Sequence, residues 1–164
     1  MIRFARFASP LGPMLAVAED SALVNVDFTD AKYAPAVGPS WIEDPSWQPL
    51  RDCAAQLAEY FAGERGRFHL PLAPRGTAWQ LRVWKEIAKV PYGETISYAE
   101  LAQRAGSAGS ARAAGGATGR NPLAIVVPCH RIVATGGSLT GYAGGLRRKE
   151  KLLALEGAFE QSAA

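Results

Sequence analysis

The chain has few of the residues that build metal sites and disulfide frameworks. Its 164 residues include two cysteines, Cys53 and Cys129, and two histidines, His69 and His130, with no Cys-x-x-Cys pair. These counts exclude a disulfide-rich scaffold and a structural zinc site of ordinary spacing. No cofactor fingerprint, such as a phosphate-binding glycine loop, occurs either. We therefore predict a protein that uses neither a metal nor a cofactor.

Long apolar runs are missing as well. No run approaches the ~20 residues of a membrane-spanning helix, and the N-terminus from Met1 to Phe4 lacks the long apolar core of a signal peptide. We therefore expect no membrane association and a cytoplasmic location. Hydrophobic residues still make up 48% of the chain, which is enough to bury the core of one domain or of two small ones.

Acidic charge is scarce in the second half of the chain. Residues 1–75 carry seven Lys or Arg and nine Asp or Glu, a net charge of −2, whereas residues 76–164 carry eleven and six, a net charge of +5. Such an excess favours a polyanionic partner, although similar excesses are common on faces that bind nothing. Charge alone therefore leaves a nucleic-acid partner open.

The first half has the pattern of a small antiparallel sheet followed by one helix. Three apolar segments separated by turn residues predict strands over residues 4–7, 14–18 and 22–28. Residues 31–45 are rich in Pro, Gly, Ser and Ala and predict a loop. Apolar residues then recur at helical spacing over 47–61, and Cys53 lies on that stripe, which favours a buried structural thiol.

The second half begins after a linker over residues 71–76, so we predict domains over 1–72 and 73–164. Capping boxes at Thr77 and Ser97 predict the start of two helices. A further short helix over 110–118 follows the Ser97 helix through a glycine-containing turn, and this pair has the proportions of a helix-turn-helix.

Two more elements are predicted near the C-terminus. Segments 131–134 and 138–140 flank a Thr-Gly-Gly turn and predict a hairpin that would form a wing. A last helix covers about 146–155. It is locally basic, and we expect its Lys and Arg side chains to form a solvated face, with a phosphate contact as the alternative. These side chains are Arg147, Arg148, Lys149 and Lys151.

The predicted helix over 110–118 has an unusual composition. Nearly all of its side chains are tiny except that of Arg112, and each glycine costs ~1 kcal/mol of helix stability relative to alanine. A helix that reads DNA sequence would instead carry Asn, Gln, Ser or Lys. Either the helix backbone approaches another surface with Arg112 projecting from it, or the helix packs against the core with Arg112 solvated.

The most informative feature is Pro128-Cys129-His130-Arg131, which follows the apolar run 123–127. It lies between Asn121-Pro122 and Gly144-Gly145, with Leu155-Glu156-Gly157 further on. Over roughly residues 76–157 this pattern resembles the O6-alkylguanine-DNA alkyltransferases, the methylated-DNA–protein-cysteine methyltransferases, of the bacterial type without zinc. The resemblance implies an α+β (α/β) fold with an N-terminal ribonuclease-H-like antiparallel sheet lobe and a C-terminal helical lobe with helix-turn-helix and wing.

The catalytic roles of three residues are implied by the resemblance. Cys129 would be the nucleophile, and a free thiol needs help from a base because it is only a few per cent ionised at neutral pH. His130 is adjacent, but neighbours in an extended chain point to opposite faces, so contact requires a turn at Cys129 or a bridging water. Glu156 would orient His130. An acid in the last turn of a helix opposes the helix dipole, although pairing of Glu156 with Lys149 or Lys151 is an alternative.

The remaining site residues are also carried over from the family. Asn121 would tie the helix-turn-helix to the active-site segment, Tyr98 would donate to the flipped guanine, and Arg112 would replace the extruded base in the stack. Ser107 and Thr135 would contact the DNA backbone. The substrate pocket would be lined by Pro128, Ile132, Tyr142, Ala143 and Gly144.

The implied function is direct reversal of DNA damage by one irreversible transfer of the alkyl group from O6-alkylguanine in double-stranded DNA to Cys129. We expect no obligate protein partner and a monomer, with cooperativity on DNA and activity on O4-alkylthymine left open. The alternatives are a lesion-binding alkyltransferase-like protein, whose members lack the cysteine, a helix-turn-helix regulator and a cysteine hydrolase.

Overall fold

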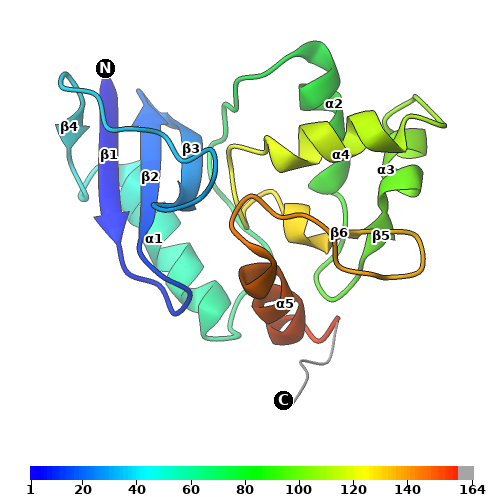
Figure 1. Ribbon diagram of the computed structural model, residues 1–164. Helices are drawn as coiled ribbons and strands as arrows, with labels where there is room; N and C mark the ends of the chain where they lie inside the picture. Colours follow the sequence, from blue (N-terminus) through cyan, green and yellow to red (C-terminus); the bar gives the residue numbers. More distant parts are fainter. Residues whose placement is uncertain (159–164) are drawn as a thin grey trace. The chain divides into compact units, whose positions relative to one another are not determined.

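A computed structural model describes residues 1–158, and the chain divides into two compact units, which are considered separately (Figure 1). The first unit contains residues 1–75 together with 122–126. The second contains 76–121 and the chain from Val127 onward. The end of the predicted C-terminal domain, 159–164, lies outside the described residues.

The first unit is a four-stranded sheet with one helix. The strand order is β3-β2-β1-β4; β1 and β3 pair antiparallel with β2, and β4 runs parallel to β1. The elements are β1 (Ile2–Phe7), β2 (Met14–Glu19), β3 (Ala22–Phe28), β4 (Ile42–Glu43) and α1 (Gln48–Phe61). Helix α1 covers one face of the sheet (Figure 1) and buries the stripe that contains Leu50, Cys53 and Leu57. The three predicted strands and this helix are thus confirmed.

Strand β4 corrects one expectation. Its two residues lie within the segment predicted as a loop, and both are exposed. Pairing of Arg3 with Ile42 and of Phe4 with Glu43 makes this short segment a strand. Apolar periodicity could not reveal it, because the strand is too short to have any.

The segment 122–126 joins the first unit through the free edge of β3. Val26 donates its backbone N–H to the Pro122 carbonyl at 2.8 Å, and its own carbonyl accepts from the Ala124 N–H at 2.8 Å. The next residue, Ile125, has a φ of +70° while the Val126 N–H bonds to the Ala124 carbonyl at 2.8 Å. A branched side chain rarely adopts this backbone conformation. The segment that leads to the cysteine motif is therefore held in a tight turn.

The second unit is mainly helical. Its elements are α2 (Ala78–Ile87), β5 (Ile96–Ser97), α3 (Tyr98–Arg104), α4 (Ala111–Gly119), the 3-10 turn η1 (Cys129–Arg131), β6 (Ile132–Val133) and α5 (Leu146–Leu155). Strands β5 and β6 pair in parallel. Helices α3 and α4 follow each other through the turn at Gly106 and Gly109, both with positive φ, which agrees with the predicted helix-turn-helix.

The helix starts differ in detail from the prediction. Thr77 forms a complete capping box, in which its hydroxyl accepts from the Gln80 N–H and the Gln80 side chain accepts from the Thr77 N–H. Ser97 caps α3 by accepting from the Glu100 N–H, but the Glu100 carboxylate pairs with Arg104 at 2.8 Å. The second predicted box is therefore half formed.

The predicted wing hairpin is also simpler than expected. Residues 132–133 form β6, but its partner is β5, and residues 138–140 are not a strand. The Ala134 N–H donates to the Ser138 carbonyl at 3.0 Å, and the Gly137 N–H donates to the Ala134 carbonyl at 2.9 Å. The segment is a closed turn because two consecutive glycines with positive φ favour turning over strand pairing.

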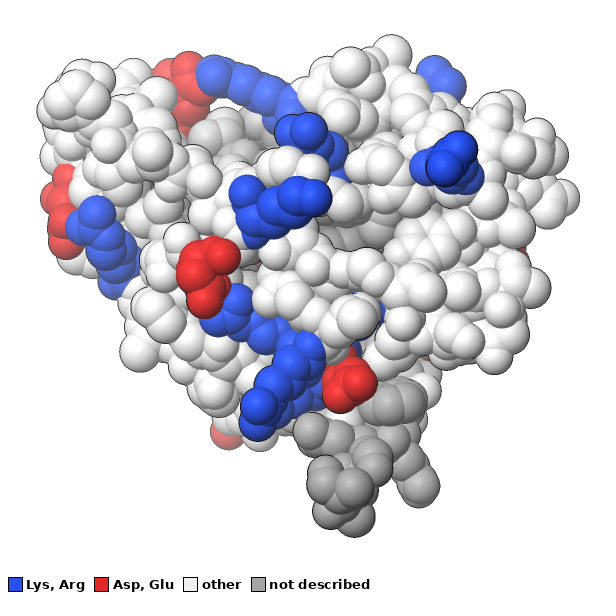
Figure 2. All heavy atoms as spheres, viewed as in Figure 1, with Lys and Arg blue, Asp and Glu red and all other residues white. Residues whose placement is uncertain are grey.

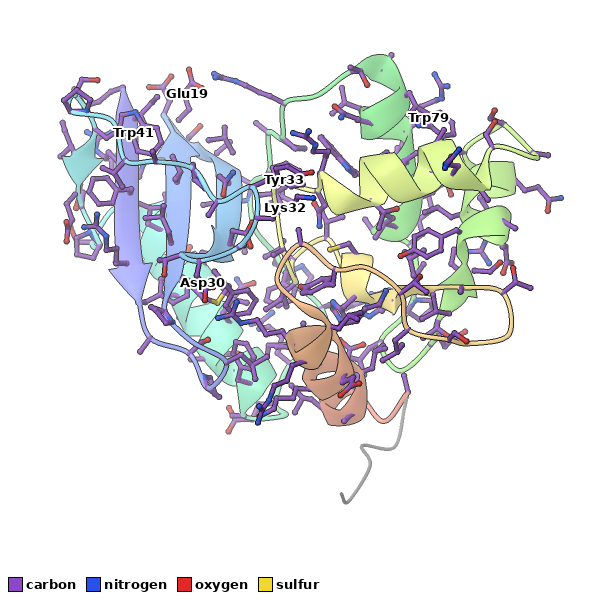
Figure 3. The ribbon with its side chains drawn as sticks, viewed as in Figure 1. Glu19, Asp30, Lys32, Tyr33, Trp41 and Trp79 are labelled. Carbon is purple, nitrogen blue, oxygen red and sulfur yellow. The ribbon has the colours of Figure 1, made fainter. Side chains whose placement is uncertain are left out.

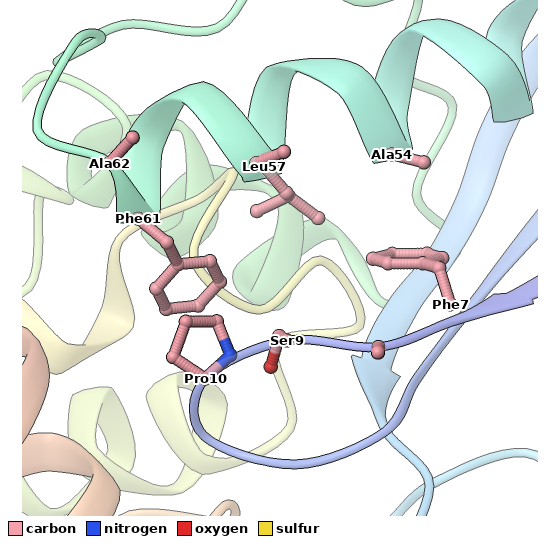
Figure 4. Close-up of a pocket in the computed structure, with 9 residues that line it drawn as sticks. Phe7, Ser9, Pro10, Ala54, Leu57, Phe61 and Ala62 are labelled. Atoms are coloured by element: carbon pink, nitrogen blue, oxygen red, sulfur yellow. The ribbon is translucent and has the colours of Figure 1, made fainter.

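Two further features bear on possible functions. Within residues 1–158, no helix is both long and apolar enough to cross a membrane. A pocket of about 330 Å³ lies in the first unit between α1 and the chain after β1, and its lining includes Phe7, Leu57 and Phe61 (Figure 4). This pocket contains none of the predicted site residues.

Candidate active site

Cys129 lies at the start of a 3-10 turn that follows a tight turn at Pro128. Pro128 has φ −81° and ψ 66°, and the Cys129 N–H donates to the Val127 carbonyl at 2.8 Å. The same carbonyl accepts from Nδ2 of Asn121 at 2.8 Å. Cys129 is buried, with 7% of its surface exposed. Proline thus fixes the approach to the cysteine, and Asn121 holds the carbonyl around which the chain turns.

His130 is completely buried and contacts Glu156. Its Nε2 lies 2.7 Å from Oε2 of Glu156, and Glu156 is 5% exposed at the C-terminal end of α5. Because a carboxylate can only accept, Nε2 carries the proton and Nδ1 of the neutral ring is the acceptor. Nδ1 has no hydrogen-bond partner among the described residues. The arrangement therefore leaves the basic nitrogen of His130 available.

Arg131 completes the buried charge network, which the sequence analysis did not anticipate. Its Nε donates to Oε1 of Glu156 at 2.7 Å, Nη2 donates to Oε2 at 3.0 Å, and Nη1 donates to the Val90 carbonyl at 2.7 Å. Glu156 therefore pairs with His130 and Arg131. Two-point contact fixes the carboxylate plane that faces His130.

The electrostatics of this network favour neutral His130. Burial lowers the pKa of His130 below its ordinary value of 6.5, the hydrogen bond and negative charge of Glu156 act in the opposite direction, and the charge of Arg131 lowers it again. A neutral imidazole can accept a proton at neutral pH, which a general base requires.

Lys149 was predicted on a solvated face of the last helix, and this prediction was wrong. Lys149 has no exposed surface, and its Nζ donates to the carbonyls of Ile132 at 2.6 Å, Thr140 at 3.0 Å and Gly141 at 3.2 Å. The spacing 146, 149, 152, 153, 156 places Lys149 on the apolar stripe of α5, and this signal could have revealed it. Other basic residues of α5 are accessible, as the blue surface of Figure 2 shows.

The Lys149 ammonium also interacts with Cys129. Burial lowers the pKa of Lys149 to about 8, and a negative charge on Cys129 acts to raise it. Because this attraction is mutual, the ammonium favours the thiolate. Lys149 therefore ties the 138–141 segment to β6 and places a positive charge near Cys129.

Tyr98 connects α3 to the same segment. Its hydroxyl donates to the Thr140 carbonyl at 3.2 Å, and its ring lies 5.7 Å from the Nζ of Lys149. Burial raises the pKa of Tyr98 above 10.0, with a smaller rise from Cys129. The phenol is therefore protonated and able to donate a hydrogen bond near the cysteine.

The other predicted residues lie on α4, in the turns before it and after β6, or near Cys129 and α5 in the chain. Arg112 is exposed on α4, Thr135 is exposed in the turn after β6, and the Ser107 hydroxyl bonds to that of Ser110 at 2.9 Å. Pro128 and Ile132 are buried and lie close to Cys129 in the sequence. Three half-buried residues precede α5, namely Tyr142, Ala143 and Gly144. The roles that the resemblance implies for these residues stay predictions.

The second cysteine has the opposite character. Cys53 has no exposed surface, and burial raises the pKa of its thiol to about 12. Such a thiol is unreactive at neutral pH. Within residues 1–158, no group of three or more His, Cys, Asp and Glu side chains could hold a metal ion.

Comparison with known proteins covers both units. Residues 2–74 match the family described as 6-O-methylguanine DNA methyltransferase, ribonuclease-like domain, and residues 78–158 match its DNA binding domain. A Methanosarcina acetivorans protein named methylated-DNA–protein-cysteine methyltransferase is 46% identical over 94% of this chain and 97% of its own. A Mycolicibacterium paratuberculosis protein of the same name is 46% identical over 95% and 93%.

The structural comparison agrees. The crystal structure of Mycobacterium tuberculosis OGT in complex with DNA matches with a TM-score of 0.87 and 42% identity, over 95% of this chain and 93% of that one. Ile125, Arg131 and Lys149, whose positions the sequence did not reveal, lie within the matched region.

Proposed function

This chain belongs to the 6-O-methylguanine DNA methyltransferase family, and from that premise we propose that it repairs DNA by moving the alkyl group of O6-alkylguanine onto Cys129. It acts by direct reversal, and DNA is its partner. The observation that carries the choice of residues is the contact between His130 and Glu156, because it fixes the histidine tautomer that can take a proton near the cysteine.

The first step is ionisation of the thiol. The Cys129 proton passes through a water molecule to Nδ1 of His130, which is the free acceptor of the neutral ring. Glu156 stabilises the resulting imidazolium, and Arg131 keeps the carboxylate in its orientation. The ammonium of Lys149 stabilises the thiolate.

The transfer itself is a displacement at carbon. The sulfur of Cys129 attacks the alkyl carbon, a C–S bond forms as the C–O bond breaks, and the electron pair of the broken bond stays on the guanine. The Tyr98 hydroxyl leaves the Thr140 carbonyl to donate its hydrogen bond to the ring. The guanine takes up one proton from solvent at a ring nitrogen, and His130 returns its proton to solvent. A thioether is inert, so each molecule reacts once.

Access to the base requires its extrusion from the duplex. Arg112 is exposed on a helix of small side chains, so it can enter the stack and fill the gap that the extruded base leaves. Ser107 and Thr135 would contact the DNA backbone, which positions the duplex without recognising its base sequence. Because these contacts are to phosphates, we expect DNA binding to show weak sequence preference and strong salt dependence.

The proposal is tested with a duplex that contains one O6-methylguanine. After incubation, the intact mass of the protein should rise by one methyl group, and peptide mapping should place that group on Cys129. The matched variants are Cys129→Ser, which should bind DNA without reacting, and Cys53→Ala, which should react like the wild type. Binding without a mass increase would favour the lesion-binding alternative, and product beyond one equivalent would exclude the single-turnover mechanism.

A further inference from the structure

Helix α4, which carries Arg112, has little stability of its own. It contains Gly115, Gly116 and Gly119, and its N-cap residue Ser110 makes no side-chain cap hydrogen bond. Glycines and a missing cap each weaken a helix, and a helix of this length is unstable without tertiary contacts. At Gly116 and Gly119 an added Cβ would meet nothing within 4 Å, so packing inside the unit does not require these glycines. Something outside α4 must therefore hold its geometry.

Two indole groups of α2 bond to successive turns of α4. Trp84 donates from Nε1 to the Ala117 carbonyl at 2.8 Å, and Trp79 donates from Nε1 to the Ala113 carbonyl at 3.2 Å. Trp84 is buried and belongs to the core, whereas Trp79 is partly exposed where α2 passes α4 (Figure 3). The Arg82 guanidinium lies 5.4 Å from the Trp79 ring centre, which favours this ring position.

We propose that Trp79 is a positioning residue for base extrusion, because its N–H fixes the carbonyl next in sequence to Arg112. The first turn of α4 lacks a side-chain cap, so the indole supplies an anchor where the helix is weakest. The inference rests on the proposed function, since it concerns the entry of Arg112 into the duplex. It predicts that Trp79 affects reaction with duplex DNA and not the chemistry at Cys129.

The test is Trp79→Phe, which retains an aromatic ring and removes the N–H donor. Single-turnover rate constants are measured with an O6-methylguanine duplex and with free O6-benzylguanine, which needs no extrusion. The ratio of the duplex rate constant to the free-base rate constant should fall about fivefold, which corresponds to the usual net free energy of one hydrogen bond. Trp47→Phe is the matched control, because Trp47 donates from Nε1 to the Asp20 carbonyl at 2.7 Å in the first unit, and its ratio should be unchanged.

Hydrogen exchange supplies a second readout. In Trp79→Phe, the amides of α4 should exchange faster while those of α5 keep their wild-type rates. If Trp79→Phe melts below the assay temperature, Arg82→Gln replaces it, with Lys85→Gln on the same exposed face as its control. The Arg82 change should lower the ratio and the Lys85 change should not.

The outcomes separate the two proposals. An unchanged ratio in Trp79→Phe, or an equal loss on both substrates, would overturn the positioning role while leaving the alkyl-transfer function intact. A wild-type protein that reacts with neither substrate would instead overturn the proposed function.

Discussion

Arg131 and Glu156 form a buried two-point ion pair, with Nε to Oε1 at 2.7 Å and Nη2 to Oε2 at 3.0 Å. The pair links the residue two positions after the cysteine to the end of α5, and it also presents Oε2 to His130. The same carboxylate therefore takes part in the buried ion pair and in the proposed chemistry.

Replacing Arg131 with methionine should strongly destabilise the protein. The change leaves the Glu156 carboxylate buried without the guanidinium that contacts both of its oxygens, and breaking a buried pair from one side typically costs about 3–5 kcal/mol of unfolding free energy. The control is Arg104→Met, which removes an exposed pair to Glu100 at 2.8 Å and should cost about 0.5 kcal/mol or less. Urea unfolding of the two variants measures both, and equal losses would contradict the prediction.

The stability of the protein should fall at mildly acidic pH because of His130. Burial holds its folded-state pKa below 6.5, so the unfolded chain takes up the proton at higher pH than the folded chain. The contribution of neutral His130 is therefore fully present above pH 6.5 and is lost as the pH falls toward the folded-state pKa. Urea unfolding at a series of pH values should show a smaller acid-side fall in His130→Asn. If stability falls as much as in the wild type, His130 is not the group responsible for the acid-side loss of stability. His69→Asn, at an exposed position, serves as the control.

Lys149→Met should slow reaction with both duplex and free O6-benzylguanine. The change removes the positive charge near Cys129 and the hydrogen bonds to the 138–141 segment. A tenfold loss of rate corresponds to a barrier that is higher by about 1.4 kcal/mol. The pKa of Lys149 is lowered to about 8, so the difference between wild type and variant should shrink as the pH rises above that value. Lys151→Met on the same helix is the control. A difference that does not depend on pH would point to packing alone.

Arg112→Ala should impair repair of duplex DNA far more than reaction with the free base. Extrusion of a base costs a few kcal/mol that the free base never incurs. Single-turnover rates on the two substrates test this expectation, with the exposed Arg104→Ala as control. Equal losses would place Arg112 in the chemistry or the fold.

Local patterns predicted most of the secondary structure. Alternating apolar segments gave β1 to β3, and the Thr77 capping box gave the start of α2, because these signals depend on neighbours in sequence. The strand β4 and the pairing of β6 with β5 were missed, since two-residue strands exist only through partners far along the chain.

In the candidate active site, too, local sequence patterns predicted some residues, whereas others depend on contacts between distant parts of the chain. Motif and resemblance pointed to Cys129, His130 and Glu156, whereas the buried positions of Arg131 and Lys149 follow from contacts with distant carbonyls. A charged side chain in a sequence suggests solvent by default. The burial of Arg131 is evident only from the acceptors that the fold brings together, whereas the apolar spacing of α5 could have indicated the burial of Lys149.

The return of residues 122–126 to the first unit affects how the chain can be divided. A fragment that begins at Gly76 would keep this segment but lose Val26, whose backbone makes two hydrogen bonds with it. Leu123 and Ile125, which are 0% and 1% exposed in the intact chain, would lose that partner strand shortly before the cysteine. The complementary fragment would keep the pairing of Leu23 with residues 71–73 but would expose the edge of β3 at Val26, and an exposed strand edge favours aggregation. The part of the chain from Gly76 onward is therefore a poor candidate for separate expression or for transfer to another protein.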